Sequence, residues 1–130
     1  MNGYLGARSA PYTAGYRQFP TTESLVGPPP SELMVFFDEH EQSINDGWFA
    51  VDMTGFDPAS PSQLRLIDYP AAYHQQGAGI SFADGRAEIH HWTDSRTILR
   101  PGQLPSGSAS PNNADRRWLH SRASSGQAAR

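Results

Sequence analysis

The sequence predicts an α+β fold: an antiparallel sheet of about four strands, a short C-terminal helix and long irregular segments. Three observations support this prediction. Apolar residues gather in short extended segments, an Asp-Gly pair separates the last two of them, and a helix-capping asparagine precedes an apolar pair near the end. The strands are expected at residues 33–38, 48–52, 78–83 and 86–92.

Chain length and the distribution of apolar residues indicate a single domain, residues 1–130. Fourteen of the 22 Leu, Ile, Val and Phe residues lie between Leu33 and Trp92, so the sheet core is expected there. The expected parts are an irregular N-terminal segment (1–30), the sheet core (31–100), a loop plus short helix (101–123) and a frayed tail (124–130).

Composition excludes several classes of protein. The net charge is −3 and the ten basic residues are scattered arginines, so nucleic acid is not an expected partner. No apolar run reaches about 18 residues and no targeting signal is recognisable, so no membrane segment is expected in this chain. The absence of cysteine excludes thiol nucleophiles and disulfide frameworks.

The first strand follows a segment that disfavours regular structure. Residues 28–30 are three prolines, which block any helix across them, and residues 21–24 favour at most one capped helical turn. In residues 33–38 the alternation predicts Leu33, Val35 and Phe37 on one face, with Met34 and Phe36 on the other.

Two further segments lie between this strand and the Asp-Gly pair at residues 84–85. Residues 48–52 form an expected strand, entered through the turn signal Asn45-Asp46-Gly47. Residues 64–69, "LRLIDY", fit either a short strand or a helical turn.

Asp84-Gly85 predicts a β-hairpin with a two-residue turn. That turn would pair Phe82 with Ala87 and Ile80 with Ile89, and these four side chains would share a face with His91. The opposite face would then carry Ser81, Arg86, Glu88 and His90. After the Pro-rich loop, Asn113 is expected to cap a terminal helix that docks through Trp118 and Leu119.

Several stretches resemble one protein family. His74, nine residues, then Asp84-Gly85 matches a His-x9-Asp-Gly motif, and the stretches that agree with the same pattern are "MNGYLG", "FFDEHEQSINDGWF", "DYPAAYH", "FADGRAEIHHW" and "SPNNADRRWL". The chain resembles pseudopilin-like proteins of Planctomycetes and Verrucomicrobia, which are related to type II secretion and type IV pilin proteins. It departs from the pattern at Arg86, where a second histidine is expected.

The resemblance implies an exported protein, periplasmic or extracellular in the parent, with a structural or protein-interaction role. Its implied partners are other pilin-like or secretion components. It further implies that this chain corresponds to the carboxy-terminal globular part, a pilin-like domain lacking its N-terminal helix.

The candidate metal ligands are imidazoles and carboxylates, a set that suits Zn or a similar divalent ion such as Mn, Fe or Ni. They are Asp38, Glu39, His40, His74 and His90. Calcium is a second possibility, held by oxygens of Asp38, Asn45, Asp46 and the carbonyls near Gly47, and calcium in some secretion pseudopilins supports it. The alternative is that these histidines hydrogen-bond to backbone and that His90 forms a solvated patch with Glu88.

Two functions follow from these readings. The first is a non-enzymatic interaction domain, and the second is a small metal-dependent hydrolase of esters or phosphoesters in which the ion activates water. The catalytic residues are not identifiable. A Ser81–His90 set with a carboxylate can be drawn, although no nucleophile-elbow motif is present. Asp84 is expected to serve the turn and not an ion.

The sequence also predicts self-association. Met34 and Phe36 are expected on one strand face, and no long helix in this chain would cover that face. Large exposed apolar side chains each forgo about 1.5–3 kcal/mol of burial. A homo-oligomer, most simply a two-fold dimer through that face, is therefore expected. The alternative covers are the terminal helix and the N-terminal segment with Tyr4, Leu5, Tyr12, Tyr16 and Phe19.

Overall fold

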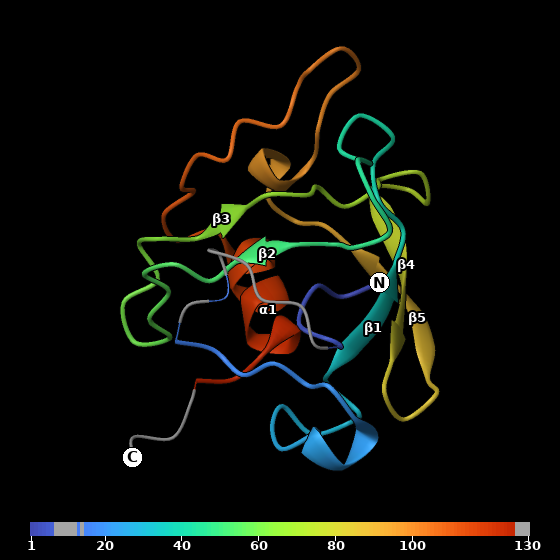
Figure 1. Ribbon diagram of the computed structural model, residues 1–130. Helices are drawn as coiled ribbons and strands as arrows, with labels where there is room; N and C mark the ends of the chain where they lie inside the picture. Colours follow the sequence, from blue (N-terminus) through green and yellow to red (C-terminus); the bar gives the residue numbers. More distant parts are fainter. Residues whose placement is uncertain (7–12, 14, 127–130) are drawn as a thin grey trace.

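A computed structural model describes residues 1–6, 13 and 15–126 and confirms the α+β class. Strands β1 (Met34–Phe37), β4 (Gly77–Phe82) and β5 (Ala87–His91) form an antiparallel sheet in the order β1-β4-β5. Strands β2 (Val51–Asp52) and β3 (Arg65–Leu66) form a second antiparallel pair, and helix α1 spans Ala114–Ala123 (Figure 1). Two 3₁₀ turns, Thr22–Ser24 and Ser95–Thr97, complete the regular elements described.

The strands form two separate sheets, and not the single sheet of about four strands that the sequence predicted. The segment expected at 48–52 contributes β2, which pairs with β3 and not with the three-stranded sheet. The ambiguous segment "LRLIDY" is a strand over Arg65–Leu66. No helix among the described residues is long and apolar enough to cross a bilayer.

A bulge in β1 changes which side chains face the core. Met34 pairs with Phe82 but Phe37 pairs with Ile80, so the register shifts between them. The expected shared face of Met34 and Phe36 is therefore wrong: Met34 is 1% exposed and Phe36 is 60% exposed. Phe37 instead stacks on Phe49 with ring centroids 4.2 Å apart.

The predicted hairpin exists, but its register is shifted by one residue. Gly85 N–H donates to the carbonyl of Phe82, and Phe82 N–H donates to the carbonyl of Arg86, so three residues form the loop. Gly85 has φ +90°, which completes a type I turn with a glycine bulge. Ile80 consequently pairs with Glu88, and Ala78 with His90.

This shift corrects the expected faces of β5. Because side chains alternate along a strand, a one-residue slip exchanges the two faces. His90 now lies on the inner face, toward α1, whereas Ile89 and His91 lie on the outer face. Ser81 and His90 are therefore on opposite faces of the sheet, and the set drawn from them is wrong.

Helix α1 packs on the inner face of the three-stranded sheet through Trp118, and its predicted cap and docking residues are confirmed. The Asn113 side chain accepts a hydrogen bond from Arg116 N–H, which caps the helix. Leu119 is fully buried, and the Trp118 ring meets the Phe82 ring edge-on.

The N-terminal segment contributes to the core and does not simply flank it. Tyr4 and Phe19 are buried in the main apolar cluster, and the buried Asn2 amide donates to the carbonyls of Met34 and Ala123. This arrangement joins the start of the chain to β1 and to the end of α1. Tyr12 lies outside the described residues.

The expected frayed tail is wrong for its first residues. Ser124 Oγ donates to the carbonyl of Arg17 at 2.7 Å, and Ser125 Oγ donates to that of Gly27 at 2.6 Å. These bonds hold the segment after α1 against the N-terminal segment. Residues 127–130 lie outside the described part of the chain.

Candidate functional site

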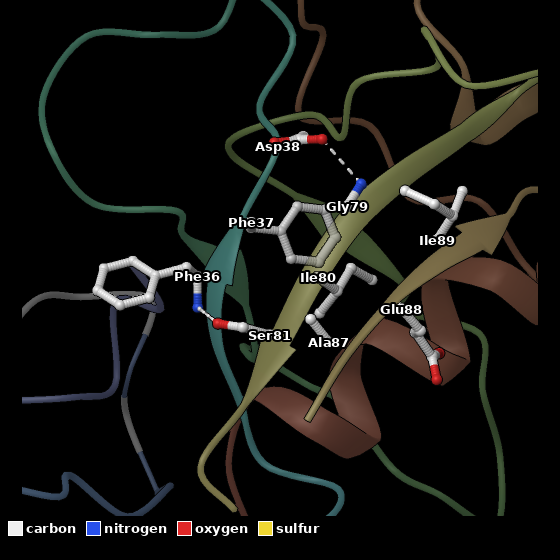
Figure 2. A pocket seen from close by; sticks show the side chains of 9 residues that line it. All are labelled: Phe36, Phe37, Asp38, Gly79, Ile80, Ser81, Ala87, Glu88 and Ile89. Carbon is white, nitrogen blue, oxygen red and sulfur yellow. Dashed lines mark hydrogen bonds between the residues drawn. The ribbon is translucent and has the colours of Figure 1, made fainter. Parts of the chain in front are cut away.

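The outer face of the three-stranded sheet carries an open apolar trough of about 560 Å³. Phe36 and Asp38 border it on the β1 side, and Ile89 borders it on β5, with Gly79 of β4 between them (Figure 2). Glycine inside a strand removes a side chain from the sheet surface, which leaves this face hollow.

Asp38 closes the irregular end of β1. Gly79 N–H donates to Asp38 Oδ2 at 2.8 Å, and Asp38 N–H donates back to the carbonyl of Gly79 at 2.9 Å. A Cβ at position 79 would lie 2.7 Å from Asp38 Oδ2. The carboxylate therefore substitutes for a ladder acceptor, and Gly79 leaves the space it occupies.

A second hollow, of about 480 Å³, adjoins the trough and shares Phe37 and Asp38 with it. His74 Nε2 lies 3.6 Å from Asp38 Oδ2, and both side chains are about half exposed. The expected approach of His74 to the acidic end of the first strand is thus present as an exposed pair. The distance suits an ion pair when the imidazole is protonated.

Glu39 borders the same hollow and is less exposed than Asp38. Burial raises the pKa of Glu39 to about 7, and the negative charges of Asp68 and Asp46 act in the same direction. The hydrogen bond that Ser43 Oγ donates at 2.9 Å opposes this rise. Glu39 is therefore partly protonated near neutral pH, which makes it a poorer cation ligand than an ordinary carboxylate.

We expect Glu39→Gln to stabilise the protein at pH 8 by about 1–2 kcal/mol and to leave stability nearly unchanged at pH 5. The folded pKa of about 7 exceeds the unfolded value of 4.5, so the folded chain binds more protons between these values. Stability from this group is present at low pH and is lost as pH rises through 7. Urea unfolding of both proteins at the two pH values measures the difference, and an equal gain at both would contradict the assignment.

His40 has a backbone partner in a turn. It is buried, its Nδ1 accepts a hydrogen bond from Gln42 N–H at 3.2 Å, and its carbonyl accepts one from Ser43 N–H. These contacts match the ordinary role of a histidine that satisfies loop backbone.

His90 does not approach Asp38, contrary to the sequence-based expectation. Its ring stacks on Trp118 with centroids 3.8 Å apart and meets Trp92 edge-on at 4.9 Å. Burial lowers the pKa of His90. The one-residue register shift explains the error, because it moves His90 to the face opposite the trough.

The described residues contain no group of three or more His, Asp or Glu side chains arranged to hold a metal ion. In the loop considered for calcium, Asp46 Oδ1 accepts from Trp48 N–H at 2.7 Å, and the carbonyl of Gly47 accepts from the Met1 ammonium at 2.9 Å. Asp84 Oδ1 accepts a hydrogen bond from Arg86 N–H, as expected for a turn residue.

The sequence predicted an uncovered apolar face that includes Phe36, but it did not reveal that exposed apolar side chains from other segments gather with Phe36 around the two hollows. Phe36 and Ile89 line the trough, whereas Ile44 and Tyr73 line the adjoining hollow. Their exposed fractions are 60%, 46%, 58% and 59%, respectively. We call these four residues, with Asp38 between them, the outer patch. The glycine at position 79 was a usable signal for it.

Comparison of the chain with protein-family models, curated proteins and solved structures finds no match.

Proposed function

We propose that this chain is the interaction domain of an exported, pseudopilin-like protein, located in the periplasm or outside the cell, and that the outer patch binds another pilin-like or secretion component. The observation that supports the proposal most is the concentration of exposed large apolar residues. Four of the seven among the described residues belong to the outer patch, and the remaining three are Val26, Ile67 and Leu104.

The physical argument concerns the cost of leaving this patch in water. Burying a large apolar side chain is worth about 1.5–3 kcal/mol, so the isolated domain forgoes a substantial stabilisation at these positions. Clustered exposure around a hollow is typical of a protein-binding surface, whereas scattered exposed residues are ordinary. The His74–Asp38 pair would supply a polar contact within the apolar surround.

A metal-dependent hydrolase is the second candidate, and the His74–Asp38 pair favours it. Two such groups beside Glu39 in an open hollow offer part of a ligand set for zinc or a similar ion. A hydrolytic ion needs further ligands and an open coordination position, which a substrate or a partner would have to complete.

Site-specific photo-cross-linking in the native host tests the proposed function. A photo-reactive phenylalanine analogue at position 36 should give discrete cross-links to a pilin-like or secretion protein, because Phe36 is an exposed member of the outer patch. The same analogue at position 104, which is 72% exposed but outside the patch, is the matched control. Equal products from both positions, or none from position 36, would refute the proposal.

Elemental analysis of the purified protein, with an ester and phosphoester panel in the presence and absence of chelator, distinguishes the hydrolase. Chelator-sensitive turnover that His74→Ala abolishes would favour the second candidate. His91→Ala is the control variant, and its turnover should be unchanged, because His91 lies on the outer face but outside both hollows.

A further inference from the structure

Strand β5 forms an edge of the three-stranded sheet, and no described strand pairs with its outer side (Figure 1). The carbonyl of Arg86 accepts from Phe82, and Trp92 N–H donates to the carbonyl of Gln76. Because bonding alternates along an antiparallel strand, Glu88 and His90 direct their backbone groups toward β4. The N–H and C=O groups of Ala87, Ile89 and His91 therefore point outward.

We infer that a second copy of this chain adds to this edge in antiparallel orientation, about a two-fold axis at Ile89. This inference names a partner for the proposed interaction domain and rests on that proposal. The two copies would form one continuous six-stranded sheet. Residue 89 would pair with residue 89 of the second copy, and residue 87 with residue 91.

Backbone geometry favours this register. It uses the outward groups of all three edge residues and forms six hydrogen bonds across the axis. A shift by two residues in either direction leaves an outward-facing residue at the end of β5 without a strand partner. Strand β5 also contains no proline, and its pairing with β4 is regular over all five residues, so neither common obstacle to edge pairing is present.

Side-chain charge selects the same register. With the axis at Ile89, Glu88 of each copy faces His90 of the other, which places a carboxylate opposite an imidazole that can donate a hydrogen bond. With the axis at position 88, the two Glu88 carboxylates would face each other, and at position 90 the two imidazoles would. Like charges directly opposite are destabilising, so they disfavour the register with its axis at position 88. The register with its axis at position 90 places no carboxylate opposite either imidazole.

The outer face benefits from the same arrangement. Ala87, Ile89 and His91 all have exposed side chains on that face. Pairing would bring the two Ile89 side chains together and would join the two troughs into one surface. The contact is short, so we expect a weak dimer with a dissociation constant on the order of 10–100 µM.

The chain has no cysteine, which permits a disulfide test of the register. Single variants Ala87→Cys, Ile89→Cys and His91→Cys are each oxidised at 100 µM protein. Directly paired residues lie about 5.5 Å apart between Cα atoms, within disulfide range. We expect efficient homodimer cross-linking from Ile89→Cys alone, and a cross-linked heterodimer when the Ala87→Cys and His91→Cys proteins are mixed.

Light scattering and sedimentation of the unmodified chain and two variants complete the test. Ile89→Pro removes an outward N–H without removing a bond to β4, so it should abolish dimers, whereas Ile89→Thr keeps the N–H and should dimerise. A monomer at 500 µM, or cross-linking that is strongest from position 87 or 91, would overturn the inference. If Ile89→Pro is monomeric and keeps the cross-links from position 36, partner binding does not depend on the dimer. If the unmodified chain dimerises but gives no cross-links from position 36, the dimer stands and the binding proposal is refuted.

Discussion

Arg116→Ala should lower the free energy of unfolding by about 3–5 kcal/mol, a large part of the about 5–15 kcal/mol typical of a domain. The Arg116 guanidinium is buried in the first turn of α1 and donates to four acceptors from distant parts of the chain. These are the carbonyls of Leu64, Ser108 and Arg96 and the hydroxyl of Tyr69, at 2.8–3.2 Å. Alanine would leave these oxygens buried without this donor.

Two neighbouring substitutions make the Arg116 experiment specific. Arg116→Lys keeps the charge but loses the planar fork, so we expect a smaller loss of about 2 kcal/mol. Arg117→Ala removes an exposed arginine one position along the same helix and should change stability by less than about 0.5 kcal/mol. Chemical unfolding followed by circular dichroism measures all three. Equal losses for Arg116→Ala and Arg117→Ala would contradict the role assigned to the buried fork.

The sequence predicted those elements that depend on neighbouring residues. The Asn113 cap and the docking of Leu119 follow from local pattern, and both are observed. The burial of Asp115 and Arg116 could not be predicted, because their partners lie in other segments of the chain. Asp115 accepts from Thr93 and Asp94, and Arg116 donates to Leu64, Tyr69, Arg96 and Ser108. A polar residue in a first helical turn ordinarily faces solvent, and only the folded loops supply the acceptors and donors that bury it.

The candidate site likewise contains one feature that the sequence predicted and one that it did not. The proximity of His74 to Asp38 was expected, because both were placed in one candidate ligand set, and it is observed. The position of His90 was not predictable, because Asp84-Gly85 serves a two-residue turn as well as a type I turn with a glycine bulge. The two turns differ by one residue, and that difference decides the face of every side chain in β5. The bulge in β1 separates Met34 from Phe36 for a similarly non-local reason, since it depends on the pairing with β4.

Trp118→Ala should destabilise the protein by about 2–4 kcal/mol at pH 8 and should raise the pKa of His90 toward its ordinary value. Trp118 stacks on the His90 ring and packs edge-on against Trp92 and Phe82. Burial is the largest cause of the lowered pKa of His90, and Arg122 acts in the same direction, whereas Glu88 and Asp115 oppose it. Removal of the indole admits water to the imidazole and so weakens the largest cause.

The pH dependence follows from the sign of this shift. A folded pKa below the unfolded value of 6.5 means that the unfolded chain binds the proton more readily, so stability from this group is lost as pH falls through 6.5. Trp118→Ala should lose less stability than the unmodified protein on acidification. The difference between their free energies of unfolding should therefore narrow from pH 8 to pH 5. NMR titration of His90 and urea unfolding at both pH values measure these effects. Arg122→Ala, which removes the cation 4.3 Å above the Trp118 ring, is the comparison variant and should cost at most about 1 kcal/mol. Because Arg122 is a smaller cause of the lowered His90 pKa than burial, this variant should raise that pKa by less than Trp118→Ala does. An unchanged or lower His90 pKa in Trp118→Ala would contradict the structural role assigned to this histidine and would reopen its assignment as a ligand.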